Sequence, residues 1–151
     1  MLIYRICRAE FATALDASGL ASRWNYDGQR VLYASATRSL AALEQLANRS
    51  GLILNVPYSI MIIEVPDSIH SFRAISPEML SSDWRRFSGY GRLQDFGADW
   101  YRRVESLVLR VPSVLIPQEY NYLIHTLHPD FGTLVRLVGV EAFDWDNRFV
   151  L

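Results

Sequence analysis

The fold is decided by residues 22–48, SRWNYDGQRVLYASATRSLAALEQLAN, which carry the signals for a turn, a strand and a helix in succession. Asp27-Gly28 predicts a tight turn, because glycine adopts positive φ angles without steric cost. Residues 31–33, VLY, form a short β-prone run. Ser35 or Thr37 then stands where a side chain caps a helix by accepting a bond from a free backbone N–H. The stretch predicts a loop, a strand and a helix that meet at one place.

We expect the helix over residues 38–48, with Leu40, Leu43 and Ala47 at helical spacing on its inward face. Glu44 follows Leu40 by about one turn and therefore shares that face. A carboxylate directed at a core is unfavourable unless it is paired or hydrogen-bonded. Glu44 is thus a candidate for a polar cleft.

The composition is that of an ordinary globular chain of 151 residues, half of them apolar and 21% charged. This length fits one domain, which we expect to span residues 1–151. The 15 basic and 16 acidic residues give a net charge of −1, so charge provides no argument for binding nucleic acid or membranes. Every basic side chain is Arg, which suits bidentate binding of phosphate, although a coding bias explains the same composition.

Cys7 is the single cysteine, so an intrachain disulfide is impossible, and its apolar neighbours favour a buried packing role. We see no signal peptide before the first expected strand and no apolar run long enough to span a bilayer. We therefore expect a cytoplasmic protein.

The rest of the chain alternates short apolar runs with loops. We expect strands at residues 2–7, 58–65, 107–111 with a continuation at 114–116, 120–124 and 133–143. We expect further helices at residues 10–15 and 93–107, the second from Phe96, Trp100, Val104 and Leu107 at helical spacing. Ser50-Gly51 is expected to end the first long helix. Loops, turns and irregular segments are expected at residues 16–22, 66–67, 68–95, 128–132 and 144–151, and the segment 68–95 is expected to begin with one short strand. Strands outnumber helices and several are sequential, so the class is α+β, with a mixed sheet core and flanking helices.

Six polar residues are candidates for a site: Arg5, Arg23, Tyr33, Glu44, Ser113 and Asn121. Each also has a structural interpretation: a surface cation for Arg23, a core aromatic for Tyr33, and an ion-paired residue for Glu44. Ser113 after a proline is typical of a turn, Asn121 of a backbone cap, and Arg5 of a strand residue facing solvent. From spacing alone, these alternatives stay open.

Familiar catalytic patterns are missing from the sequence. It has no phosphate-binding glycine loop, no GxSxG, no HExxH and no cysteine-based metal set. His125 and His128 are three residues apart, but no third ligand is evident, so we predict no metal site. Ser113 lacks an obvious Asp to orient a histidine, which argues against a hydrolase triad.

Within the opening stretch, several short segments stand in a characteristic order: Ser22-Arg23-Trp24-Asn25, Gly28, Leu32-Tyr33-Ala34-Ser35, Ser39-Leu40-Ala41 and Leu43-Glu44. This order resembles the RES-domain proteins, the toxin halves of bacterial toxin–antitoxin pairs. The resemblance extends over nearly the whole chain through Tyr4-Arg5-Ile6, Val111-Pro112-Ser113, Asn121-Tyr122-Leu123 and His128-Pro129-Asp130-Phe131. Two positions depart from it: Ala21-Ser22 precede Arg23 where a glycine is common, and His125 stands where an asparagine is common.

The resemblance implies a fold like that of ADP-ribosyltransferases and a toxin that consumes NAD⁺ by breaking its nicotinamide–ribose bond. It assigns catalysis to Glu44, Arg23, Tyr33 and Ser113, and binding of NAD⁺ to Arg5, Arg23, Tyr33, Ser113 and Asn121. NAD⁺ is then the substrate, with no metal. The implied partner is a helical, DNA-binding antitoxin of the Xre type. The acceptor of ADP-ribose is left open among water, phosphate and a protein side chain.

Two other functions remain open at this point. One is a catalytically silent module of the same fold that only binds its partner. The other is an enzyme that binds a nucleotide other than NAD⁺.

Overall fold

The computed structural model describes residues 1–48 and 55–149. Within these residues seven strands form one mixed sheet, in the order β4-β5-β6-β2-β1-β3-β7. The strands are β1 (Leu2–Arg8), β2 (Val31–Ser35), β3 (Tyr58–Glu64), β4 (Phe72–Ala74), β5 (Val108–Pro112), β6 (Tyr120–His125) and β7 (Arg136–Phe143). The helices are α1 (Arg38–Ala47), α2 (Tyr90–Arg103) and α3 (Phe131–Leu134), with 3-10 turns η1 (Ala9–Phe11), η3 (Ile69–Ser71), η4 (Pro77–Met79), η5 (Phe87–Gly89) and η6 (Asn147–Phe149). The predicted α+β class with a mixed sheet is confirmed.

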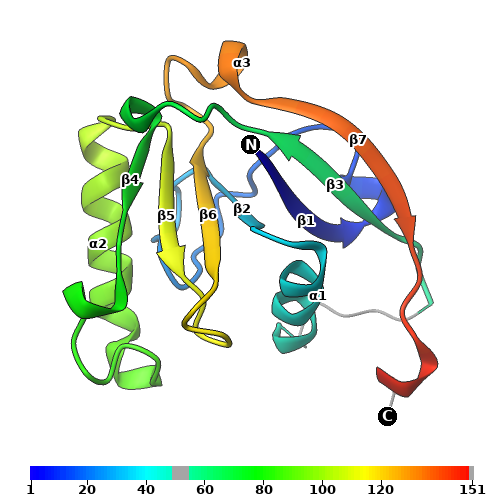
Figure 1. Ribbon diagram of the computed structural model, residues 1–151, viewed down its shortest axis with the longest axis horizontal. Helices are drawn as coiled ribbons and strands as arrows, with labels where there is room; N and C mark the ends of the chain where they lie inside the picture. The colour runs from blue at the N-terminus through cyan, green and yellow to red at the C-terminus, as the bar shows by residue number, and fades with distance from the viewer. Residues whose placement is uncertain (49–54, 150–151) are drawn as a thin grey trace.

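The sheet is divided into two halves that meet at a single point. In the described chain β1 pairs with β2 only through Tyr4 and Ser35, whereas β1 pairs with β3 along its whole length. The halves β4-β5-β6-β2 and β1-β3-β7 consequently splay apart, and α1 lies below the place where they separate (Figure 1). This separation opens a space between the strands for a site.

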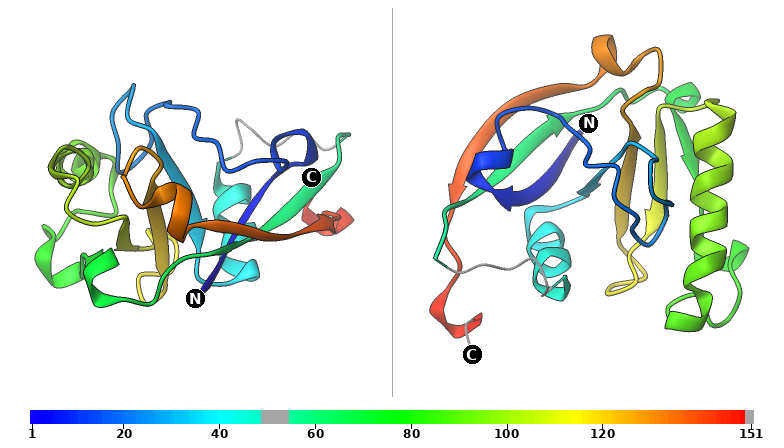
Figure 2. Two further views of the ribbon diagram at one scale, coloured as in Figure 1. Left: turned by 90° about the horizontal axis from the view of Figure 1, so that it is seen from above. Right: turned by 180° about the vertical axis from the view of Figure 1, so that it is seen from behind.

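Helix α2 covers one face of the β4-β5-β6 half, as the view from behind shows (Figure 2). It buries Leu93 and Trp100 against Leu109 and Leu123 of the sheet, and Trp24 of the opening stretch joins this cluster. Helix α1, on the other side of the space, packs through Ala41 on a different apolar cluster with β1 and β3. The two helices that flank the space are therefore held by separate cores.

The face that α1 buries differs from the one expected. Thr37 caps the helix, since its side chain accepts a bond from the Leu40 N–H at 3.1 Å. Leu40 and Ala41 are buried, but Leu43 is 44% exposed and Ala47 is exposed too. Successive helical residues are about 100° apart, so the buried side of α1 is centred between Leu40 and Ala41. Glu44 lies on this side of the helix, whereas Leu43 lies away from it. The predicted inward position of Leu43 and Ala47 is wrong, and the end predicted at Ser50-Gly51 lies outside the described residues.

The second long helix begins earlier and ends earlier than predicted. It starts at Tyr90 and ends at Arg103, because Val104 adopts the left-handed conformation with φ 54° and terminates the helix. Leu107 is fully buried beside β5, so its apparent helical spacing with Trp100 reflects a shared core rather than a shared helix.

Three smaller predictions also need correction. Residues 114–116 form a turn instead of a strand, because the Ser113 hydroxyl accepts bonds from the Leu115 and Ile116 N–H groups. The expected 10–15 helix is only the short turn η1, and the expected strand 133–143 is divided between α3 and β7. The buried strand at 58–65 is confirmed as β3, which lies between β1 and β7.

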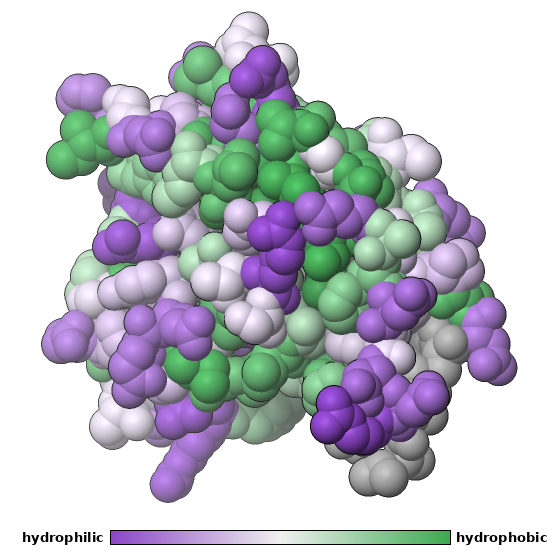
Figure 3. All heavy atoms as spheres, turned by 45° about the vertical axis from the view of Figure 1, so that its right-hand side comes forward, coloured by the Kyte–Doolittle hydropathy of each residue, from purple (hydrophilic) through white to green (hydrophobic). Residues whose placement is uncertain are grey.

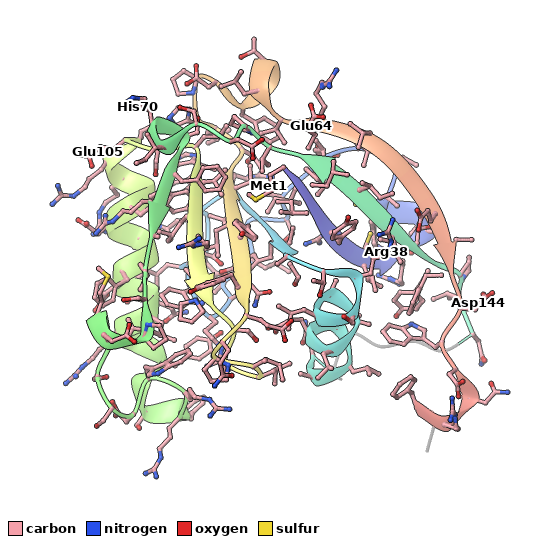
Figure 4. All side chains as sticks on the ribbon, in the orientation of Figure 1. Met1, Arg38, Glu64, His70, Glu105 and Asp144 are labelled. Atoms are coloured by element: carbon pink, nitrogen blue, oxygen red, sulfur yellow. The ribbon has the colours of Figure 1, made fainter. Side chains whose placement is uncertain are left out.

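Strand β7 forms one edge of the sheet and exposes Val138 and Val140. Charged side chains flank these valines: Arg136 pairs with Glu64 and Arg38 pairs with Glu141, the positions labelled Glu64 and Arg38 in Figure 4. On this side of the molecule charged and apolar surface is interspersed (Figure 3). Such charges discourage pairing of a free edge with another strand.

Cys7 is buried, and burial raises the pKa of its thiol, with the Arg5 charge acting in the opposite direction. This environment fits the packing role predicted for it. No helix in residues 1–48 or 55–149 is long and apolar enough to cross a bilayer.

Candidate active site

A cavity of about 580 Å³ lies where the two halves of the sheet separate. Its walls come from β1, β2, α1, the loop before β2 and the start of α2, and side chains of α1 and β6 extend toward one another there (Figure 4). Five of the six candidate residues line it: Arg5, Arg23, Tyr33, Glu44 and Asn121. The structure thus brings together residues that are far apart in the sequence.

The loop that carries Arg23 is held in place by its neighbours. Trp24 is buried in the core under α2, so Arg23 beside it is directed to the cavity side. Asn25 is 1% exposed and its amide donates to the carbonyl oxygens of Leu20 and Tyr26, both at 3.0 Å. Gly28 has φ 87°, which confirms the predicted tight turn. These contacts fix the loop before β2 without using the Arg23 side chain.

Arg23 itself is an unsatisfied cation. Its Nη1 is buried and has no hydrogen-bond partner among the described residues, and no described carboxylate forms an ion pair with it. Its guanidinium lies 5.1 Å from the centre of the Tyr90 ring. Since buried polar groups are normally paired, this free N–H group indicates that the cavity is built to hold an acceptor that the chain does not supply.

Tyr33 lines the cavity and contacts the loop that carries Arg23. Its hydroxyl donates to Asn25 Oδ1 at 2.7 Å and accepts from the Trp24 N–H at 3.1 Å. Burial raises the pKa of Tyr33, and the bond from the Trp24 N–H opposes this only in part, so the phenol stays neutral. With its hydroxyl engaged in the loop, Tyr33 presents its ring to the cavity.

Arg5 spans the gap between the two halves of the sheet. Its Nη1 donates to the Tyr33 carbonyl oxygen at 3.1 Å, where β1 and β2 no longer pair. The side chain thereby replaces a strand-to-strand hydrogen bond and remains half-buried at the cavity wall. Arg5 therefore reaches into a cleft and does not simply face solvent, the structural interpretation given for it above.

Glu44 lies at the centre of a short hydrogen-bond network. Its Oε1 accepts from Ser113 Oγ at 2.8 Å and from Asn121 Nδ2 at 2.6 Å. Asn121 Oδ1 in turn accepts from Ser35 Oγ at 2.7 Å. Within the described chain Oε2 of Glu44 has no partner, so the carboxylate is oriented by one oxygen and offers the other to the cavity.

The structure places Ser113 behind Glu44 instead of at the cavity wall. It is fully buried, and its hydroxyl accepts from the Leu115 and Ile116 N–H groups while it donates to Glu44. A hydroxyl has one donor and two acceptor positions, so this group is saturated. Ser113 therefore orients the carboxylate and does not reach a ligand directly.

Three residues of this site were not predicted as members of it. Ser35 orients Asn121, Asn25 orders the Arg23 loop, and Tyr90 contacts Arg23 from α2. Ser35 had a competing interpretation as a helix cap, and Tyr90 lies in a segment without periodicity. Ser35 and Asn25 lie in segments that carry the resemblance described above, whereas no local pattern marks Tyr90.

His125 lies outside the site and is used for packing. It is 2% exposed and stacks on the Tyr101 ring at 4.0 Å between centroids. Its Nδ1 accepts from the Leu127 N–H and its Nε2 donates to the Tyr101 carbonyl oxygen. Burial lowers the pKa of His125, with the bond to Tyr101 opposing the shift, and both ring nitrogens are engaged in a neutral tautomer.

The charges at the cavity favour an anionic ligand. Arg5 and Arg23 are the cations of the described wall, and Glu44 is its carboxylate. Two cations face one carboxylate, and Nη1 of Arg23 has no partner among the described residues. Such interactions are stronger at a partly buried site than in bulk water, because the effective dielectric constant is lower there.

Comparison with known proteins gives consistent similarities. A family model described as "RES domain" matches residues 2–146. The chain is 35% identical over 150 residues to a protein of Sphingobium named "Prs ADP-ribosylating toxin", covering 97% of this chain and 91% of that protein. It is 30% identical over 152 residues to a "Toxin Res" of Yersinia enterocolitica, covering 98% and 99%. The fold resembles a chain of the M. tuberculosis MbcT-MbcA toxin-antitoxin complex with a TM-score of 0.73 and 16% identity, covering 95% of this chain and 84% of that one.

Proposed function

Because the chain belongs to the RES domain family, we propose that it is the toxin of a toxin–antitoxin pair and cleaves the nicotinamide–ribose bond of NAD⁺. The names of its relatives support the proposal: two are called toxins, and one of these is called ADP-ribosylating. An ADP-ribosylating enzyme takes ADP-ribose from NAD⁺ and releases nicotinamide. The observation that carries the proposal is Glu44, a carboxylate oriented at Oε1 with Oε2 open to a cavity that has an unpaired arginine.

The two arginines suit the anionic part of NAD⁺. Its pyrophosphate is the strongest hydrogen-bond acceptor of the molecule, and the free Nη1 of Arg23 is a donor without a partner in the described chain. A guanidinium binds phosphate through parallel, charge-assisted bonds. Arg5 lies at the same cavity and adds positive charge, while one of its nitrogens stays bound to the Tyr33 carbonyl oxygen.

Glu44 suits the reacting part. When the bond between nicotinamide and ribose breaks, its electron pair leaves with the nicotinamide nitrogen, and positive charge develops on the ribose, as in glycoside hydrolysis. A fixed carboxylate stabilises this charge where it forms. Ser113 and Asn121 hold Glu44 through Oε1, so that Oε2 faces the ribose or one of its hydroxyl groups.

The remaining residues shape the cavity. Tyr33 presents its ring as a flat apolar surface for the nicotinamide or the ribose, because its hydroxyl is engaged by Asn25 and Trp24. Asn121 lines the cavity but directs its amide N–H to Glu44, so it acts mainly on the carboxylate. In this assignment Arg23 and Glu44 carry the chemistry, and Ser113 contributes through Glu44.

Purified protein incubated with NAD⁺, with and without phosphate, tests the proposal. We expect release of nicotinamide when phosphate is present, and release without phosphate as well if water or a side chain of this protein is the acceptor. The second product identifies the acceptor: free ADP-ribose for water, a phosphorylated ADP-ribose for phosphate, and protein-bound ADP-ribose for a side chain. Binding of NAD⁺ without any release of nicotinamide would instead identify a catalytically silent module.

The partner that we propose is an antitoxin of the helical, DNA-binding Xre type, which covers the cavity with a terminal segment near Arg5 and Arg23. A carboxylate at the end of such a segment would meet the free Nη1 of Arg23. Expression of this chain is expected to arrest growth, and co-expression of the neighbouring reading frame to relieve the arrest. Arrest that continues unchanged beside that neighbour would contradict the pairing.

A further inference from the structure

One stripe of α2 contacts the loop that carries Arg23 at four successive points. Tyr90, Gln94, Gly97 and Tyr101 are spaced by four, three and four residues, so they share one face of the helix. Gln94 Nε2 donates to the carbonyl oxygens of Ser22 at 3.1 Å and Asn25 at 3.3 Å.

The other contacts of this stripe are equally close. A Cβ on Gly97 would overlap the carbonyl oxygen of Trp24, so the helix approaches the loop as closely as glycine permits. Tyr101 accepts at its hydroxyl from the Arg30 N–H at 3.1 Å. The loop from Ser22 to Arg30 is therefore bound along α2, and the two are expected to move as one unit.

Tyr90 is the residue of this stripe that reaches the cavity. It is half-buried at the cavity wall, and its ring lies 5.1 Å from the Arg23 guanidinium. The turn before it is fixed, because a Cβ on Gly89 would come within 2.6 Å of the Asp83 carbonyl oxygen. Asp83 also accepts bonds from Ser81 and Ser88 at its carboxylate. A ring on a fixed backbone thus faces an arginine that has no ion pair in the described chain.

We infer that Tyr90 is a positioning residue for the ligand: its ring holds the Arg23 guanidinium in the orientation that directs the free Nη1 at an anionic group. The face of an aromatic ring attracts a guanidinium, and the attraction strengthens where water is excluded. Without the ring, the guanidinium would lose this contact and sample more rotamers before binding. The phenolic hydroxyl is not needed for this action. The inference rests on the proposed role of Arg23 in binding NAD⁺.

The experiment compares binding of ADP-ribose, which cannot turn over, by calorimetry. Tyr90→Leu removes the ring and is expected to weaken binding roughly 3- to 30-fold, the range of a cation–π contact. Tyr90→Phe keeps the ring and is expected to bind within about twofold of wild type. Phe87→Leu is the matched control, because Phe87 is the next aromatic residue, 6.1 Å away between ring centroids, but is 91% exposed and does not line the cavity.

A double variant distinguishes an action through Arg23 from a general loss of structure. If Tyr90 acts on Arg23, adding Tyr90→Leu to Arg23→Ala will cause no further loss of affinity. A double variant that loses the product of both single effects would overturn the inference. So would an unchanged affinity of Tyr90→Leu where Arg23→Ala weakens binding.

A second measurement needs no ligand. The Arg23 Nε–H signal in nuclear magnetic resonance, assigned by its absence in Arg23→Ala, reports the order of the guanidinium. We expect an ordered, ring-shifted signal in wild type and Tyr90→Phe, and a mobile one in Tyr90→Leu. An identical signal in all three would overturn the inference even if NAD⁺ proved not to be the substrate. Failure of wild type to bind ADP-ribose, with the signal changed as expected, would instead count against the proposed function alone.

Discussion

Replacing Glu44 by Gln or by Ala separates its two contributions, charge in the cavity and acceptance of hydrogen bonds. Oε1 accepts from Ser113 and Asn121, whereas Oε2 has no partner in the described chain. An amide that places its oxygen at the Oε1 position keeps both bonds, and its NH₂ group then faces the cavity. Alanine removes the acceptor of two donors, the buried Ser113 hydroxyl and the half-buried Asn121 amide.

The magnitudes follow from these contacts. A bond to a charged group contributes about 1.5–3 kcal/mol and a neutral one about 0.5–1.5 kcal/mol, so Glu44→Gln weakens each bond by roughly 1 kcal/mol. The substitution also removes a half-buried charge that has no ion pair among the described residues, which offsets that loss. We expect the free energy of unfolding to stay within about 1 kcal/mol of wild type for Gln. For Ala we expect a loss of roughly 2–4 kcal/mol from two unsatisfied donors.

Thermal melting and nicotinamide release are measured on the same preparations. For a chain of 151 residues, 1 kcal/mol corresponds to about 2–4 °C in Tm, so the two variants are expected to differ by several degrees. Both are expected to lose most NAD⁺ cleavage and to abolish toxicity on expression. A Gln variant that melts as low as the Ala variant would refute the idea that Oε1 alone anchors the carboxylate. A folded Gln variant with nearly normal turnover would refute its role in stabilising charge.

Three further predictions concern other parts of the molecule. Arg23→Ala is expected to weaken binding of ADP-ribose by roughly 1.5–3 kcal/mol, the contribution of a charge-assisted bond. Its Tm should change little, because Nη1 has no partner in the described chain; an unfolded variant would show that Arg23 is structural. Burial lowers the pKa of His125, so below pH 6.5 the unfolded chain binds a proton at this residue more readily than the folded chain does. The free energy of unfolding is therefore highest above pH 6.5 and falls as the pH drops below that value. Urea unfolding at pH 7.5, 6.5 and 5.5 measures this decline, which should be shallower in His125→Asn. An equal decline of the free energy of unfolding with pH in wild type and His125→Asn would contradict the assignment. Gly97→Ala is expected to destabilise the fold by about 1–3 kcal/mol, because its Cβ would overlap Trp24. Gly91→Ala in the same helix meets open space and should be neutral or stabilising by up to about 1 kcal/mol. Equal effects of the two substitutions on Tm would argue against the close approach of α2.

The local signals of the opening stretch predicted its structure well. Asp27-Gly28 forms the turn, β2 begins at Val31, and Thr37 caps α1. Each of these depends on neighbours in the sequence, so a single sequence contains the information. The face that α1 buries was not predicted correctly, because Leu43 fits the apolar period but the sheet lies on the side of Leu40 and Ala41.

The site could be predicted in part. Five candidate residues line one cavity, but Ser113 lies behind it, because two backbone N–H groups of the following turn occupy its oxygen. Tyr90 was not predicted at all, since its contact with Arg23 joins positions 67 residues apart in the chain (90 − 23). Contacts of this range depend on how α2 packs on the sheet, and no local pattern encodes that.

Cleavage of the nicotinamide–ribose bond in this cavity is tested most directly by following nicotinamide by chromatography after purified wild-type protein is mixed with NAD⁺ and phosphate. We expect steady release by wild type and little release by Glu44→Gln at equal folded concentration. Binding of ADP-ribose in the cavity, with nicotinamide still attached to all of the NAD⁺ after prolonged incubation, would contradict this expectation.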